Sequence, residues 1–276
     1  MSERSFPRFP LGQRVQHALL ILSFTTLGLT GLSQTFAASP FGERIVAALG
    51  GIEWVRIGHR AAAVVLMVTG IWHLLDAAYH IFVLRRPLSM LPRAKDVVDF
   101  WQTLRYNLGR AAARPRMGRF TFEEKVEYWA LLWGTGLMVA TGFMLWNPLA
   151  TTRFLPGQWI PAAQVVHAGE AILAVLAVIV WHGYGVHLRH FNRSMFTGTM
   201  TESEMRHEHP LELESLLADP PPAVDEVARG RRRRVFWPVC VVVTLTLAAG
   251  LVWFVTLEDT ALPVKPSATT AAPAGS

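Results

Sequence analysis

Histidine is the residue type that carries chemistry in this sequence, because most of its ten histidines lie within or at the ends of long apolar stretches. The stretch "GHRAAAVVLMVTGIWHLL" is almost wholly apolar yet contains His59 and His73, fourteen residues apart. A second apolar stretch, residues 164–188, contains His167 and His182, fifteen residues apart. Ionisable side chains inside such stretches are costly and therefore point to function.

Helix geometry places these histidines at two depths. In an α-helix, residues fourteen apart lie about 21 Å apart and within about 40° of one face, whereas residues fifteen apart lie about 22 Å apart and differ by about 60°. Both stretches are expected to run inward across a membrane. His59 and His167 then share an outer level, and His73 and His182 share an inner level. His17, at the start of the first apolar stretch, also belongs near the inner level.

Paired histidines at two levels are what two stacked b-type haems require, since each iron takes two axial imidazoles from facing helices. Such iron has no open coordination position, which favours electron transfer over catalysis at the metal. Zinc fits poorly, because its ligands cluster at one point. The single cysteine, Cys240, excludes an iron–sulfur cluster, an intrachain disulfide and a covalent CxxCH haem.

The elements that must position these side chains are five apolar blocks. The chain of 276 residues is 51% hydrophobic and only 17% charged. Each block has about twenty residues or more, enough to cross a hydrocarbon core of about 30 Å. Only helices or closed barrels can span it, and apolar runs this long are helical. The blocks cover residues 15–37, 58–84, 125–147, 164–188 and 235–256. We therefore predict an all-α membrane protein with five transmembrane helices. Four form a haem-binding bundle, and the fifth, which has no histidine and no charge, lies outside it.

This reading divides the chain into successive parts. Residues 38–57 form an outer loop with a short interfacial helix at "PFGERIVAALGGIEWV", and Trp101 and Tyr106 in the 85–124 connection suit a membrane interface. We find no internal sequence repeat. The expected parts are a cytoplasmic arm (1–14), a di-haem domain (15–190) with a cytoplasmic connection (85–124), a cytoplasmic segment (191–234) containing the linker "DPPPA", the fifth helix (235–256) and a disordered outer tail (257–276).

Lysine and arginine set the expected orientation. They concentrate in the N-terminal arm, in residues 85–124 and in "RGRRRR" before the fifth helix. Cytoplasmic loops carry this excess, so we expect a cytoplasmic N-terminus and an outer C-terminus in a bacterial inner membrane. The net charge of +6 is explained by this topology, and no nucleic-acid partner is needed.

Two other functions compete with a haem protein. One is a membrane anchor or assembly subunit whose histidines bind nothing. For three histidines at the inner boundary, His80, His187 and His190, a position at the membrane interface without a ligand role is favoured. The other is a proton-coupled transporter, which would prefer a chain of acidic residues and histidines with interrupted helices. Asp76 and Glu170 are acidic residues within the spans, but no pair of interrupted helices is evident.

Four segments resemble the cytochrome b subunits of formate dehydrogenase, thiosulfate reductase and nickel–iron hydrogenase. These are "QRVQHALLILSFTTLGLTGL", "GHRAAAVVLMVTGIWHLL", "EKVEYWALLWGTGLMVATGFMLWNP" and "VVHAGEAILAVLAVIVWHGYGVHLRHFNRSMFTG". The R-x-x-H opening and the two-histidine fourth span are the specific parts of the resemblance, which covers roughly residues 10–200.

The resemblance implies a di-haem, quinone-reactive membrane subunit of a respiratory-chain oxidoreductase complex, with no catalytic residue of its own. His59 and His167 would hold the outer haem, and His17 and His182 the inner haem. Quinone or menaquinone would be the substrate. The partner would be a catalytic, multihaem or iron–sulfur subunit, docked on "MTESEMRHEHPLELE" or on the outer loops.

The sequence departs from that family at the inner level. Fifteen residues separate the histidines of the fourth span, where the formate dehydrogenase type has fourteen. His73 is additional and competes with His17 as the partner of His182, and a third haem held by His73 with His187 or His190 remains an alternative. In "FTFEEK", Lys125 matches the family's quinone-binding segment, while Thr121 and Glu124 replace its amide residues. All three are quinone-site candidates.

Other residues could accommodate the cofactor. Arg60 is a candidate partner for a haem propionate, or alternatively a snorkelling interface residue. Glycines in the first and third spans clear room for a macrocycle, or equally permit close helix packing. These are Gly28, Gly31, Gly134, Gly136 and Gly142.

Overall fold

The computed structural model describes residues 3–189, 191–218 and 225–256. Within them, five helices are long and apolar enough to cross a membrane, as predicted. The spans are α1 (Leu11–Thr35), α3 (Ile52–Phe82), α5 (Phe122–Trp146), α7 (Trp159–Ala177) continued by the π-helical η1 (Val178–Arg189), and α11 (Glu226–Thr256).

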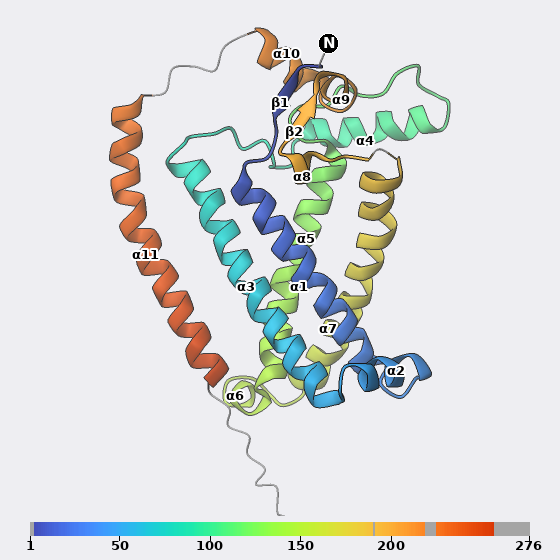
Figure 1. The fold of residues 1–276 in the computed structure, drawn as a ribbon, viewed down its shortest axis with the longest axis vertical. Helices are drawn as coiled ribbons and strands as arrows, with labels where there is room; N and C mark the ends of the chain where they lie inside the picture. Colours follow the sequence, from blue (N-terminus) through green and yellow to red (C-terminus); the bar gives the residue numbers. More distant parts are fainter. Residues whose placement is uncertain (1–2, 190, 219–224, 257–276) are drawn as a thin grey trace, which may run out of the picture.

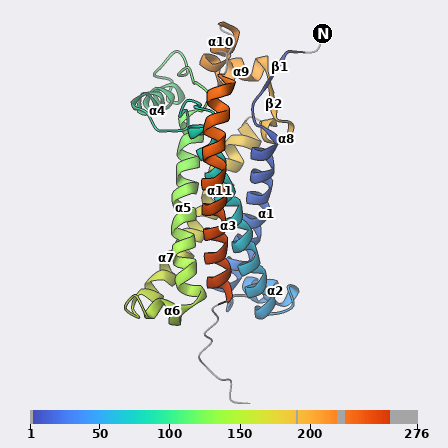
Figure 2. The ribbon, with the colours of Figure 1, turned by 90° about the vertical axis from the view of Figure 1, so that its left-hand side faces the viewer.

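Four of these helices form the bundle, and the fifth stands beside it (Figures 1 and 2). The closest packing is between α1 and α3 and between α5 and α7, and α1 also contacts α7. Helix α11 meets the bundle through aromatic rings near both its ends. Tyr79 of α3 lies 5.5 Å from Phe236, and Phe143 of α5 lies 4.6 Å from Phe254, measured between ring centroids.

Short elements gather at the two ends of the bundle (Figure 1). We call the end that carries the chain's N-terminus the N-terminal end, and the other the α2 end. The N-terminal end carries β1 (Ser5–Pro7), α4 (Ala94–Asn107), α8 (Ser194–Thr197), β2 (Thr199–Thr201), α9 (Glu202–Glu208) and α10 (Pro210–Ala218). The α2 end carries α2 (Pro40–Ala48) and α6 (Pro148–Thr152).

Residues 3–9, 116–121 and 198–214 fold together into what we call the N-terminal cap. Strands β1 and β2 pair antiparallel, with Phe6 opposite Met200. These two side chains form a small apolar core with Met205 and Leu213. The segment "MTESEMRHEHPLELE", expected to dock a partner, therefore turns its main apolar side chains into the protein's own fold.

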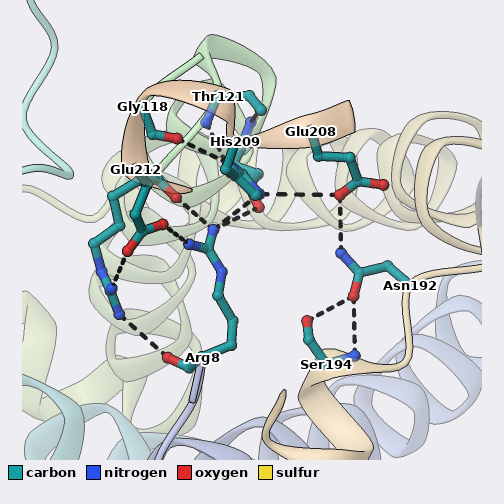
Figure 3. Close-up of polar contacts among 10 residues, drawn as sticks. Arg8, Gly118, Thr121, Asn192, Ser194, Glu208, His209 and Glu212 are labelled. Carbon is teal, nitrogen blue, oxygen red and sulfur yellow. Dashed lines mark hydrogen bonds and ion pairs between the residues drawn. The ribbon is translucent and has the colours of Figure 1, made fainter. Parts of the chain in front are cut away.

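A buried arginine joins the three parts of the cap (Figure 3). Arg8 is only 3% exposed. Its Nη1 donates to Glu212 Oε2 at 2.6 Å, and its Nη2 donates to the backbone carbonyl of Arg119. Nη2 also lies 3.1 Å from Nε2 of His209, whose Nδ1 is 2.8 Å from the carbonyl of Gly118. Since arginine has no acceptor atom, His209 accepts through Nε2 and donates through Nδ1.

Burial governs the ionisation of this network. Desolvation first, and the charge of Arg8 second, lower the pKa of His209 to about 3, against the hydrogen bond to Gly118. Desolvation also lowers the pKa of Arg8, partly offset by Glu124 and Glu212. The cap is therefore built around a neutral histidine.

Several predicted boundaries were wrong because they followed the apolar blocks. Helix α3 begins at Ile52 and α11 at Glu226, each ahead of its apolar block. Arginine is a good helix former, so "RGRRRR" is helical rather than a connection. The described parts of the segment 191–234 hold α8, β2, α9, α10 and the start of α11. The expected interfacial helix in the 38–57 loop is present as α2, capped by Ser39, whose Oγ accepts from the Gly42 N–H. The linker and the tail, residues 219–224 and 257–276, lie outside the described residues.

Candidate haem-binding sites

His59 of α3 and His167 of α7 face each other near the α2 end of the bundle. Their ring centroids are 6.4 Å apart, and the rings are inclined at 67°. The Oγ1 of Thr30 lies 2.9 Å from Nδ1 of His59, and the Oγ1 of Thr141 lies 2.9 Å from Nδ1 of His167. Each histidine is thus held by a threonine on the helix packed beside it.

The hydroxyl bonds indicate the tautomer of both histidines. Thr30 Oγ1 also lies 2.6 Å from the carbonyl of Thr26, and Thr141 Oγ1 lies 2.8 Å from that of Leu137. A hydroxyl that gives its one proton to a carbonyl can only accept from the imidazole. Nδ1 therefore carries the proton, and the lone pair on Nε2 is left for a ligand.

Glycines stand directly against these two imidazoles. A Cβ at Gly31 would lie 3.2 Å from Cε1 of His59, and one at Gly142 would lie 3.4 Å from Cε1 of His167. Each glycine follows the threonine that holds the same ring. The Thr-Gly pair of α1 thus recurs in α5, a correspondence between the two halves that the sequence analysis missed.

His17 of α1 and His182 of η1 form a second pair, nearer the N-terminal end. Their ring centroids are also 6.4 Å apart, with the rings inclined at 49°. The oxygen that holds His182 differs in kind from those at the first pair. Oε2 of Glu127 lies 2.8 Å from Nδ1 of His182, so a carboxylate takes the place of a hydroxyl.

His73 occupies the same depth but is engaged on both ring nitrogens. Nδ1 lies 3.1 Å from Oε1 of Gln16, and Nε2 lies 3.0 Å from the hydroxyl of Tyr128. An amide oxygen only accepts, so Nδ1 carries the proton and Nε2 accepts from Tyr128. The lone pair that a metal would need is thus already hydrogen-bonded.

The π-helical segment η1 explains the spacing of fifteen residues. Its hydrogen bonds run from i to i+5, so each turn takes more residues than an α-helical turn. The segment begins at Val178 and includes His182. It therefore offsets the rotation that fifteen α-helical residues would produce. π-Helical turns occur frequently at functional sites.

The two histidine pairs fit a haem iron. A metal–nitrogen bond of about 2 Å on each side, plus about 1 Å from each nitrogen to its ring centre, gives a centroid separation of roughly 6 Å. Both pairs have 6.4 Å. Among the described residues, no group of three or more histidine, cysteine or acidic side chains could hold a metal ion. The donor sets are thus pairs rather than a cluster.

A candidate partner for a haem propionate lies at the α2 end. The guanidinium of Arg60 lies 5.2 Å from the ring centroid of Trp146. Within the described part of the chain, Nε1 of Trp146 is buried without a hydrogen-bond partner. Such an N–H is suited to a carboxylate acceptor. Arg60 was predicted from the sequence as a propionate partner, whereas Trp146 was given no such role, since an indole near a helix end is ordinary at a membrane interface.

The three quinone-site candidates lie at the start of α5 and are engaged with protein groups. Thr121 and Glu124 form a capping box, at 2.8 Å and 3.1 Å. Nζ of Lys125 lies 2.8 Å from Oδ1 of Asp96 in α4. Burial disfavours the charged form of Asp96, but hydrogen bonds from Lys125 and the Arg93 N–H outweigh it and lower its pKa.

The remaining histidines of the spans lie outside both pairs. His80 Nδ1 is 2.8 Å from the carbonyl of Asp76 in its own helix and 3.5 Å from its carboxylate. His80 thus contacts a residue of its own helix, one turn away. The side chain of His187 and the whole of His190 lie outside the described residues.

Helices that span a membrane and oppose histidines in pairs define a class of protein, the helical membrane cytochromes. Comparison with known families agrees. The family described as prokaryotic cytochrome b561 matches residues 8–198, and the chain belongs to that family. It is a multi-pass bacterial membrane protein, a b-type cytochrome that binds haem b and serves transmembrane electron transfer. No curated protein matches the chain.

Proposed function

We propose that this cytochrome carries electrons between the quinone pool and a partner redox subunit through two b haems. His59 and His167 hold one haem, and His17 and His182 hold the other. The observation that carries the proposal is the occurrence of two histidine pairs, each with ring centroids 6.4 Å apart, at two depths of one bundle. Bis-histidine haem supplies one-electron transfer without an open coordination position.

The residues around each pair keep the ligands in place. Thr30, Thr141 and Glu127 accept from Nδ1 and so fix the ring orientation of three of the four histidines. Gly31 and Gly142 keep side-chain bulk away from the two imidazoles that they face. Arg60 and Trp146 would receive a propionate at the α2 end.

His73 is assigned a supporting role rather than that of a ligand. Its two ring nitrogens bond to Gln16 and Tyr128. This favours His17 as the partner of His182 and argues against a third haem held by His73.

A quinone or menaquinone site belongs near the N-terminal end, beside the His17–His182 pair. The candidates remain Thr121, Glu124 and Lys125, which begin α5 at this end. A quinone head group there would replace an existing bond, such as that between Lys125 and Asp96.

The N-terminal end is proposed to face the cytoplasm and the C-terminus the outside of the inner membrane, because the arginine-rich segments gather at that end. The family resemblance suggests a catalytic, multihaem or iron–sulfur partner of the kind served by formate dehydrogenase, thiosulfate reductase or nickel–iron hydrogenase cytochromes. The cap's outward surface and the loops of the α2 end are the two available docking places.

The test is a haem count with a quinol assay. Purified protein reduced with dithionite should show the α-band of haem b, and a pyridine haemochrome assay should give two haems per chain. A reduced menaquinol or ubiquinol analogue should reduce the haems in detergent. One haem, three haems or no reduction by quinols would each overturn a stated part of the proposal.

A further inference from the structure

The two histidine pairs differ in the oxygen that accepts from the ligand's Nδ1–H. Threonine hydroxyls accept at His59 and His167, each at 2.9 Å. At His182 the acceptor is the carboxylate of Glu127, at 2.8 Å. Both pairs have the same centroid separation of 6.4 Å.

The kind of acceptor matters because it changes the basicity of the ligand. A hydrogen bond to an ionised acceptor is roughly twice as strong as one between neutral groups. It draws the Nδ1 proton away and raises the electron density on Nε2. A more basic axial ligand favours the ferric state, and hydrogen bonding around the ligands is one of the means by which proteins set haem potentials.

The placement of Glu127 in the repeated half of the bundle supports this role. Fourteen residues before the Thr-Gly pair of α1 stands Gln16, and fourteen before that of α5 stands Glu127. Each of these side chains contacts Nδ1 of a histidine on the neighbouring helix, Gln16 that of His73 and Glu127 that of His182. Glu127, which faces the proposed ligand His182, has a carboxylate side chain, whereas Gln16, which faces His73, has a neutral amide.

We propose that Glu127 acts through His182 to make the His17–His182 haem the lower in reduction potential of the two. The proposal rests on the proposed function, since it requires both haems. Electron transfer between the haems is then downhill from the N-terminal end towards the α2 end.

The experiment is a spectroelectrochemical titration of the full-length protein in detergent, at one fixed pH, with the haem content of every variant measured by pyridine haemochrome. Wild type should give two waves. In Glu127→Gln the midpoint potential of the lower wave should rise by about 59 mV. For one electron this is a tenfold change in the equilibrium constant of reduction. The upper wave should stay in place.

Two further variants fix the assignment. Glu123→Gln removes the same charge one helical turn away and should leave both waves in place. Thr141→Val removes the hydroxyl that holds His167 and should move the upper wave only.

Failure of the inference differs from failure of the proposed function. A wild-type protein without two haems would remove the proposed function itself. If two haems are present but Glu127→Gln moves neither wave, or no more than Glu123→Gln does, Glu127 does not set the potential. If Thr141→Val moves the lower wave, the order of potentials is reversed, and this result holds even if Glu127→Gln fails to retain haem.

Discussion

At the scale of single residues, the site is defined by how each imidazole is oriented. His59, His167 and His182 each direct Nδ1 to an oxygen of a neighbouring helix. His73 lies in an equally apolar stretch, but both of its ring nitrogens are hydrogen-bonded, to Gln16 and to Tyr128. Residue type alone does not separate these cases, because the neighbouring acceptor or donor decides which histidine can bind a metal.

The glycine against His59 gives a test at this scale. Gly31→Ala should lower the haem content of the purified protein, because the new Cβ would lie 3.2 Å from Cε1 of His59. Overpacking of this kind costs about 1–3 kcal/mol, and Gly31→Val should cost more. Pyridine haemochrome on equal amounts of protein measures the loss.

Gly136→Ala is the matched control, since a Cβ there meets nothing within 4 Å. Equal haem loss in both alanine variants would show that helix packing, rather than room for the imidazole, is what these glycines supply.

At the scale of elements, the N-terminal cap is a folded unit that ties the chain's first strand to segments far away in the sequence. Acid should open it. His209 is fully buried and its pKa is lowered to about 3 by desolvation first and the charge of Arg8 second. The unfolded chain binds the proton near pH 6.5, so stability is present above 6.5 and falls with pH down to about 3.

Between pH 7 and pH 5 the free energy of opening the cap should therefore fall by about 2 kcal/mol. Limited proteolysis at each pH, followed by identification of cuts in residues 198–214, measures it. His209→Gln should flatten this pH dependence. An unchanged slope in that variant would assign the effect to other groups.

Helix α4 is a second element with a testable place. It lies across the N-terminal end of the bundle (Figure 1), and Trp101, at 57% exposure, shares its outward side with Val97 and Leu108. We expect Trp101 to lie among lipid head groups. In vesicles of lipids brominated near the head group, Trp101→Phe should lower the quenchable share of tryptophan fluorescence. Lipids brominated deep in the chain should show no such difference.

At the scale of the whole molecule, single histidine substitutions should remove one proposed haem and leave the other in place. His59→Ala and His17→Ala should each leave one haem per chain, because each removes a ligand of a different pair. His73→Ala should retain both, since His73 bonds to Gln16 and Tyr128. Haem counts and low-temperature α-band spectra distinguish these outcomes. Loss of one haem in His73→Ala with retention in His17→Ala would reverse the assignment.

The direction of insertion is the other property of the whole molecule. Reporter fusions after residue 37 and after residue 147 should be active only outside the cytoplasm, and fusions after residue 90 only inside. The excess of arginine at the N-terminal end predicts this result. The opposite pattern would place the α2 end in the cytoplasm. Downhill transfer between the haems would then run towards the cytoplasm instead of away from it.

The sequence by itself determined the five spans, because runs of about twenty apolar residues leave a membrane helix as the stable solution. It also determined the pairing of His59 with His167, since their depths follow from helical rise and chain direction. The starts of α3 at Ile52 and of α11 at Glu226, ahead of "RGRRRR", were not predicted. Helices continue past the apolar block wherever the residues are good helix formers.

Only the tertiary structure favours His17 over His73 as the proposed ligand, for a physical reason. Both lie at the same depth, and depth is all that spacing supplies. The choice depends on which imidazole faces His182, and the ring of His17 does so, whereas His73 bonds to Gln16 and Tyr128 of other helices. The direction in which His182 points likewise depends on the π-helical geometry of η1. The spacing of fifteen residues was interpreted with α-helical geometry, which gives a different rotation.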